Sequence, residues 1–286
     1  MNKRLIRAAL FVLVAMAPVT HAAEAFCNEP DQNGERRIVV ITASYNNKDW
    51  YQANLDSIFA QNYTNYRVIY IDDCSPDGTG DLVEQYIKEN GQEHRVTLVK
   101  NKKHCGAMAN HYNAITTCDD RDIIVIVDGD DCVARQGVFN YLNNVYADNS
   151  IWLTYGQFVE FPSGCHGFCC PMPRHVIERN AFRDFEHIPS HMRTFYAGLF
   201  KQIKKEDLMY QGEFLKMDAD IAAMFPMIEM ARDHFRFIPE VLYAYNGGNA
   251  LNDHKISKSM QRQLDLMLRA KPRYNKAKSP IREQGA

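Results

Sequence analysis

The sequence IIVIVDGDD at residues 123–131 joins an unbroken aliphatic run to three carboxylates and one glycine. A run with no polar alternation predicts a strand that is buried on both faces of a parallel sheet. Parallel α/β sheets bind ligands beyond the carboxyl ends of their strands, which is where these carboxylates would lie. Several buried acids need a neutralising cation, so we expect a divalent ion, Mg²⁺ or Mn²⁺, together with a phosphorylated ligand. We also expect Gly129 to leave room for that ligand.

Strand and helix patterns alternate around this run. Strands are predicted at residues 37–42, 66–71, 96–99 and 152–158, and helices at residues 50–59, 82–87, 108–117 and 138–146. This alternation is typical of right-handed βαβ units, so the predicted fold class is α/β, with a mainly parallel, Rossmann-like sheet flanked by helices. The strand at 66–71 ends in a second acidic pair, Asp72 and Asp73, and we expect it to neighbour the strand that ends at Asp128.

The C-terminal half is less regular. Residues 161–189 contain prolines, glycines and three cysteines with little periodicity, which predicts a functional loop or a lid. A helix at 218–232, strands at 235–238 and 241–245, and a helix at 257–270 are predicted after it. Residues 271–286 form a polar tail that we expect to be frayed.

The N-terminus has the pattern of a secretory signal. Basic residues precede an apolar run at 8–19, and small residues follow it. The run is shorter than the ~20 residues that span a bilayer as a helix. Residues 1–22 are therefore predicted to be a signal peptide, or else an uncleaved signal anchor. We expect export through the secretory pathway, with membrane contact only through such an anchor.

The chain has eight cysteines, and export would place them in an oxidising compartment where they could pair. Cys165, Cys169 and Cys170 cluster within the irregular stretch. A zinc knuckle would need a second Cys-x-x-Cys motif, which is missing, so a disulfide staple in the loop or free thiols are favoured.

Three motifs, at residues 38–47, 71–79 and 126–131, together resemble those of the family 2 glycosyltransferases of the GT-A fold. The resemblance covers about residues 36–158, which it implies to be the nucleotide-sugar-binding half of one domain at 36–270. Residues 159–270 would then be the acceptor-side extension. The resemblance implies an inverting, metal-dependent enzyme that moves a sugar from a nucleoside-diphosphate donor to a hydroxyl of a glycan, lipid or protein acceptor.

The resemblance also implies roles on the donor side, residue by residue. Thr42 and Ser44 would contact the nucleotide, and Asp73 would hydrogen-bond the base. Asp128 would lie near the ribose, and Asp130 would bind the Mn²⁺ or Mg²⁺ ion that bridges the diphosphate. The role of Asp131 is left open.

On the acceptor side, Asp220 matches the acid that takes the proton of the attacking hydroxyl, with Asp218 as the alternative. An aspartate at a helix start could instead be a helix cap. His191 and Arg193 could bind phosphate or acceptor through bidentate contacts, or lie on a solvated surface. His254 could be a third metal ligand or a clamp on the diphosphate.

Other function classes are disfavoured by what the sequence lacks. The net charge is −2 and no long basic run is present, which argues against a nucleic-acid partner. Residues 43–47 form no glycine-rich phosphate loop of the kind that a sugar nucleotidyltransferase carries, and residues 261–263 do not reproduce the Gln-x-x-Arg-Trp motif of processive synthases. A non-catalytic glycan- or nucleotide-binding protein of the same fold stays open, although acids at all three expected positions argue against it.

Overall fold

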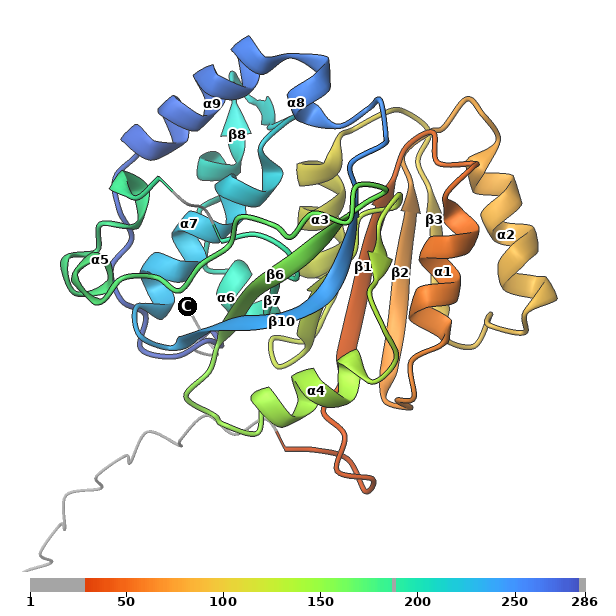
Figure 1. Ribbon diagram of the computed structural model, residues 1–286, viewed down its shortest axis with the longest axis horizontal. Helices are drawn as coiled ribbons and strands as arrows, with labels where there is room; N and C mark the ends of the chain where they lie inside the picture. Colours follow the sequence, from red (N-terminus) through yellow and green to blue (C-terminus); the bar gives the residue numbers. More distant parts are fainter. Residues whose placement is uncertain (1–28, 187–188, 283–286) are drawn as a thin grey trace, which may run out of the picture.

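The computed structural model describes residues 29–186 and 189–282 (Figure 1). The signal predicted at residues 1–22 lies outside the described residues, as do Cys27 and the side chain of His254. Within the described ranges, no helix combines the length and the apolar character needed to span a bilayer.

An eight-stranded sheet forms the centre of the fold, in the order β3-β2-β1-β4-β7-β6-β10-β5. Neighbouring strands from β3 to β4 are parallel, as are β6 and β10, whereas β7 is antiparallel to both of its neighbours and β5 is antiparallel to β10. The strands are β1 (Ile38–Ser44), β2 (Tyr66–Asp72), β3 (Val96–Lys100), β4 (Ile123–Ile126), β5 (Cys132–Val133), β6 (Leu153–Phe161), β7 (Thr194–Tyr196) and β10 (Phe235–Asn246). A separate hairpin joins β8 (Met209–Tyr210) to β9 (Glu213–Phe214).

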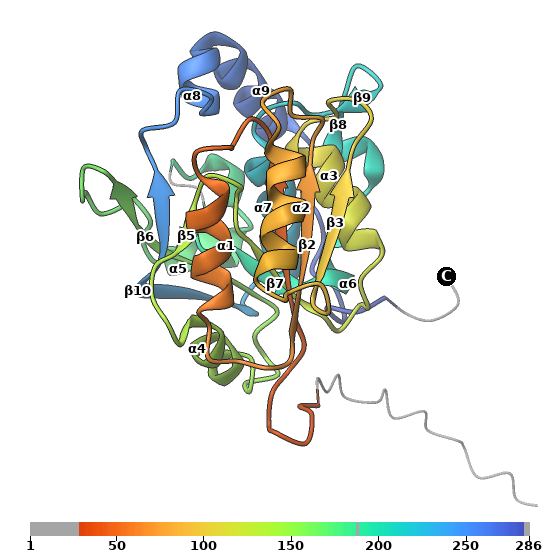
Figure 2. The same ribbon diagram turned by 90° about the vertical axis from the view of Figure 1, so that its right-hand side faces the viewer.

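Helices cover both faces of the sheet. Helices α1 and α2 lie on one face, and α3, α6 and α7 lie on the other (Figures 1 and 2). The helices are α1 (Tyr51–Phe59), α2 (Thr79–Glu89), α3 (Ala107–Thr116), α4 (Val138–Val145), α5 (Arg174–Arg179), α6 (Ala197–Phe200), α7 (Ala219–Ala231), α8 (Asp253–Ile256) and α9 (Lys258–Ala270). Helices α8 and α9 lie together at the top of both views (Figures 1 and 2).

The central strands are aliphatic because both of their faces are covered. Val40 of β1 pairs with Val125 of β4, and both side chains are fully buried. Burial of this kind contributes roughly 1.5–3 kcal/mol per large aliphatic side chain. The α/β class and the mainly parallel sheet predicted from the sequence are therefore confirmed.

Three local expectations are wrong. The strands that end at Asp73 and Asp128 are not neighbours, because β1 lies between β2 and β4. The two strands expected at 235–238 and 241–245 are one strand, β10, which continues through an irregularity in its pairing with β6. The stretch at 161–189 also contains a short helix, α5, and a 3₁₀ turn (Phe182–Asp184).

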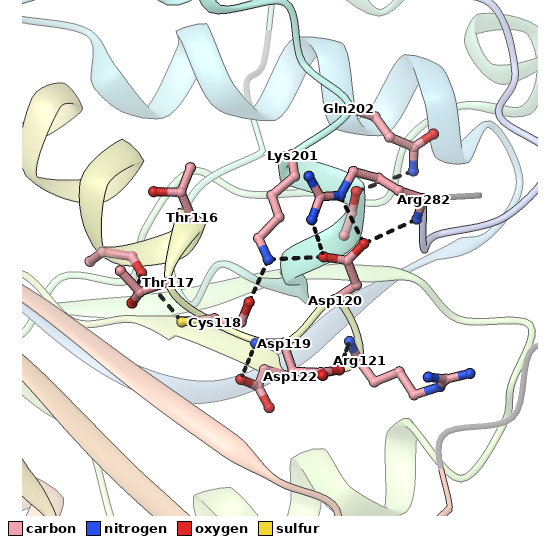
Figure 3. A network of polar contacts seen from close by, with 12 residues as sticks. Thr116, Thr117, Cys118, Asp119, Asp120, Arg121, Asp122, Lys201, Gln202 and Arg282 are labelled. Carbon is pink, nitrogen blue, oxygen red and sulfur yellow. Dashed lines mark hydrogen bonds and ion pairs between the residues drawn. The ribbon is translucent and has the colours of Figure 1, made fainter. Parts of the chain in front are cut away.

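The polar tail is held against the domain, contrary to the expectation of fraying. The backbone N–H of Ala277 donates to the carbonyl oxygen of Met230 (2.9 Å). Farther on, the guanidinium of Arg282 donates to both carboxylate oxygens of Asp120, each at 2.9 Å, and Lys201 donates to the same carboxylate (2.9 Å) (Figure 3). The tail therefore ties the last described residues to the segment that enters β4.

The seven cysteines among the described residues are all free thiols. Of the alternatives left open for Cys165, Cys169 and Cys170, the structure therefore shows free thiols and not a disulfide staple.

Candidate functional site

A cleft of about 390 Å³ lies beyond the carboxyl ends of β1 and β4. The acids after β4, Asp128, Asp130 and Asp131, line it together with Asp220 from the start of α7. This is the edge of a parallel sheet at which ligands bind. The structure thus brings together the two acidic motifs that the sequence places nearly a hundred residues apart.

Buried side chains from distant elements hold the turn that follows β4. Asn54 of α1 donates through Nδ2 to the carbonyl oxygens of Asp128 (3.0 Å) and Asp131 (2.8 Å). Tyr243 of β10 accepts from the backbone N–H of Asp128 (3.1 Å) and donates to Oδ2 of Asp131 (2.6 Å). Both Asn54 and Tyr243 are fully buried, so this turn has the rigidity of the core.

Gly129 is required by the protein and not by a ligand, which corrects the expectation from the sequence. A Cβ atom at this position would lie 2.6 Å from Cβ of Ser44 and 2.8 Å from Nδ2 of Asn47. These distances are shorter than non-bonded atoms tolerate. The turn therefore packs directly onto the end of β1, and only glycine fits there.

Burial raises the pKa of two acids of the turn. Burial raises the pKa of Asp130 to about 6, although a hydrogen bond from Nδ2 of Asn249 (2.6 Å) opposes the shift. Burial also raises the pKa of Asp131 well above its usual value, and the neighbouring charges of Asp130 and Asp128 raise it further. A cluster of this kind favours binding of a cation, which relieves the repulsion.

The geometry groups Asp128, Asp131 and His191 as candidate metal ligands. One carboxylate oxygen from each aspartate and one ring nitrogen of His191 lie within 4.8 Å of one another. Burial lowers the pKa of His191 to about 3, so the ring is neutral and can act as a ligand. Its buried Nδ1 has no hydrogen-bond partner in the described part of the chain. Two carboxylates and an imidazole suit Mn²⁺, so these residues fit the metal that the family resemblance implies.

Asp130, the residue expected to bind the metal, is outside this group and bonds to Asn249 instead. His254, the other expected ligand, belongs to α8, and its side chain lies outside the described residues. The assignment of Asp130 and His254 to the metal stays a prediction. The three residues that the geometry groups were not predicted to bind the metal. The sequence left the role of Asp131 open, placed Asp128 near the ribose, and gave His191 a possible role in binding phosphate or acceptor.

Arg193 joins the two acidic motifs. Its carbonyl oxygen accepts from the backbone N–H of Ile126 (3.2 Å), so β7 enters the sheet directly beside β4. Its side chain, 7% exposed, donates to Oδ2 of Asp128 (3.0 Å) and lies 3.3 Å from Oδ2 of Asp220. Burial raises the pKa of Asp128, but the charge and hydrogen bond of Arg193, together with His191 and His111, outweigh burial, so the net shift is downward. Of the alternatives for Arg193, the solvated surface is excluded.

Asp220 lies in the first turn of α7, whose N-cap residue is Asp218. Its Oδ1 accepts from the backbone N–H of Ile221 (2.8 Å), while the other oxygen faces Arg193. The side chain is 27% exposed, so it is open to the cleft as well as bonded to its own helix. Asp220 therefore has access to a ligand, as its expected role as a base requires.

The carboxylate of Asp73 is surrounded by donors from its own chain. It accepts from Nδ2 of Asn101 (2.7 Å) and from the backbone N–H groups of Cys105 (2.9 Å) and Gly106 (2.7 Å), and Nδ1 of His104 lies 3.0 Å away. Burial opposes ionisation, but these hydrogen bonds lower the pKa of Asp73 overall. Asp73 therefore anchors the start of α3, and its contact with a nucleotide base stays a prediction.

The end of β1 presents alternate residues to the cleft. Ala43 and Tyr45 line it, whereas Thr42 and Ser44 are 0% and 2% exposed. Ser44 accepts from the hydroxyl of Tyr70 (2.9 Å) inside the core. Donor contacts by the side chains of Thr42 and Ser44 stay a prediction.

Two cleft residues were missed by sequence reasoning. His111 of α3 is 8% exposed, and burial lowers its pKa to about 4. Asn249 follows β10 and bonds to Asp130. A histidine inside a helical pattern and an asparagine in a loop carry no distinctive signal, so only the packing of α3 and β10 against the turn after β4 reveals them.

Residues 39–163 match the family model described as Glycosyl transferase family 2. TuaG of Bacillus subtilis (strain 168), named as a teichuronic acid biosynthesis glycosyltransferase, is 33% identical over 99 residues, which are 35% of this chain and 38% of that protein. The match thus spans well under half the length of that curated relative.

Two solved structures share the fold at low sequence identity. S. aureus TarS 1–349 in complex with UDP-GlcNAc has a TM-score of 0.55 at 14% identity, over 77% of this chain and 61% of that chain. The mannosyltransferase PcManGT from Pyrobaculum calidifontis, in complex with GDP-Man and Mn²⁺, has a TM-score of 0.55 at 20% identity, over 85% of this chain and 65% of that chain. The chain therefore has the GT-A fold that the resemblance implied.

Proposed function

We propose, from the match of residues 39–163 to the glycosyltransferase family 2 model, that the chain transfers a sugar from a nucleoside-diphosphate donor to an acceptor hydroxyl. The transfer inverts the anomeric carbon and requires a divalent metal. The donor class is supported by the solved structures of the same fold, which were determined with UDP-GlcNAc and with GDP-Man. The cleft of about 390 Å³ is large enough for a ligand of this kind.

The observation that carries the proposal is the pairing of one buried guanidinium with two acids. Arg193 contacts Asp128 after β4 and Asp220 at the start of α7. Arg193 lines the cleft, and its guanidinium has five N–H donors, more than its contacts with the two acids use, so donors are left for a ligand. A charged group of this type is suited to a diphosphate, because a guanidinium presents a planar set of donors to phosphate oxygens.

Asp128, Asp131 and His191 would hold the metal. A divalent ion bound there would supply positive charge to stabilise a departing diphosphate. The low pKa of His191 keeps its ring available as a ligand over the physiological range.

The chain's own residues account for the movement of the proton. The acceptor oxygen attacks the anomeric carbon from the side opposite the nucleotide, and the bond to the diphosphate oxygen breaks with its electron pair. Asp220 accepts the hydroxyl proton as the new bond forms. Arg193 orients Asp220 and, with its remaining donor, stabilises the phosphate charge that develops. Attack from the opposite side inverts the configuration.

A screen of UDP- and GDP-sugars with Mn²⁺ tests this proposal. The released nucleoside diphosphate is quantified by anion-exchange chromatography, with and without EDTA, and the anomer of the product is assigned by proton NMR. We expect EDTA-sensitive release with inversion for at least one donor. A non-catalytic binder would release no diphosphate from any donor and would retain donor affinity in an Asp130→Asn variant.

A further inference from the structure

A second cavity, of about 520 Å³, adjoins the cleft on the side of α7 and α9. Asp218 and Gln261 line both cavities, so the two share a wall. Asp218 is the N-cap of α7 and precedes Asp220 by two positions. A molecule in the second cavity would therefore lie beside the N-terminus of α7, the helix that carries the proposed base.

Two cations that make no direct ion pair within the described part of the chain line this second cavity. Lys258 and Arg262 are exposed, and they lie one turn apart on α9, where residues four apart share a face. Among the described residues neither has an ion-pair partner. Asp265, an acid of the same cavity, is already paired with Arg269 at 2.8 Å. Glu186 and Asp218 line the cavity as well, so the positive charge that could bind an anion is local to Lys258 and Arg262 on α9.

An aromatic ring lies on the wall of the same cavity. Phe168 is 53% exposed, although it is braced by an edge-to-face contact with Phe158 at 5.6 Å between ring centroids. An accessible ring that is fixed in place can stack on the apolar face of a sugar ring. Lysine and arginine beside it supply the donors that bind phosphate.

We propose that this second cavity is the acceptor subsite and that it takes a sugar carrying a phosphate. Lys258 and Arg262 bind the phosphate, and Phe168 stacks on the sugar. The role of the bound molecule as acceptor rests on the proposed transferase function, whereas its binding does not. The phosphate can belong to a soluble glycan or to a lipid headgroup, since the apolar side chains of Ile256 (59% exposed) and Met260 (41% exposed) lie on the same α8–α9 segment.

Calorimetric titration of the full chain tests the subsite. The probes are glucose 1-phosphate, glucose, and the octyl phosphodiester of glucose, each added in the presence of UDP and Mn²⁺ so that the donor cleft is occupied. The variant is Lys258→Gln with Arg262→Gln. Arg179→Gln is the control, because Arg179 is exposed on α5, away from both cavities.

We expect the double variant to weaken glucose 1-phosphate binding by about tenfold or more, since hydrogen bonds to charged groups are lost. The weak binding of glucose, which carries no phosphate, should not change. Tighter binding of the octyl compound than of glucose 1-phosphate assigns a lipid-borne acceptor, and equal binding assigns a soluble one. Glucose 1-phosphate affinity that is equal in the wild type and the double variant overturns the subsite. If the wild type binds glucose 1-phosphate but turns over no donor, the transferase function is contradicted and the subsite is not.

Discussion

Arg193 and Asp220 form an ion pair across the cleft, with 3.3 Å between Nη1 and Oδ2. Arg193 comes directly before β7 in the chain, and Asp220 lies in the first turn of α7, so the pair links the sheet to the helix that carries the proposed base. Because Arg193 also donates to Asp128, a change at this guanidinium alters the position of both acids.

Replacing Arg193 by lysine keeps the charge but removes the planar fork that reaches both acids. We expect kcat to fall by about a hundredfold, as small misplacements of a catalytic group do, with a smaller change in KM. Steady-state kinetics of Arg193→Lys beside Arg179→Lys measures the difference. A kcat equal to that of the wild type would show that Arg193 does not position Asp220.

His191→Asn and Asp130→Asn separate the two assignments of the metal. The geometry places a ring nitrogen of His191 with Asp128 and Asp131, and leaves Asp130 bonded to Asn249. We expect His191→Asn to weaken Mn²⁺ binding at least tenfold and Asp130→Asn to weaken it less, when bound Mn²⁺ is measured by electron paramagnetic resonance. The opposite order would support the assignment of the metal to Asp130.

Asp120 makes the stability of the chain depend on pH. Burial raises its pKa, but hydrogen bonds from Arg282 and Lys201 outweigh burial and bring the pKa to about 2 (Figure 3). An unfolded aspartate has a pKa of about 3.9. Because the folded pKa is the lower one, the contacts stabilise the fold above about pH 4, and the stabilisation is lost as the pH falls towards about 2.

Asp120→Asn should therefore lower the free energy of unfolding at neutral pH. The difference from the wild type should shrink as the pH falls from about 4 to about 3. Urea unfolding followed by circular dichroism measures it, with Asp119→Asn as the control because Asp119 is exposed and makes no ion pair with these cations. A difference that stays constant over this pH range would contradict the role of Asp120.

Much of the fold follows from local sequence. The aliphatic run at 123–127 predicts a strand that is buried on both faces. Turn residues such as Gly78 separate the alternating helices and strands. β7 was missed because it has three residues and follows an irregular stretch, so no period can be read from it. Its insertion between β4 and β6 is a tertiary effect.

The site was only partly predictable for the same reason. The acids at 128–131 and at 220 stand at element ends, where sequence position implies spatial position. The residues that contact those acids do not stand at such positions, so the sequence does not show where they lie. His191 and Arg193 lie just before β7 in the chain, and Asn249 lies just after β10, so the placement of these two strands brings them to the cleft. Asp73 matches a motif, yet its donors come from the loop before α3, which the motif does not describe.

Release of nucleoside diphosphate by the wild type and by Asp220→Asn tests the central claim most directly. The control is Asp81→Asn, since the Asp81 side chain is 89% exposed and pairs only with Lys100 among the described residues. We expect release from at least one nucleotide sugar with Mn²⁺. The rate of release should fall by about 10²- to 10⁴-fold in Asp220→Asn and should not change in Asp81→Asn. Equal release by Asp220→Asn and the wild type, or no release from any donor, would contradict it.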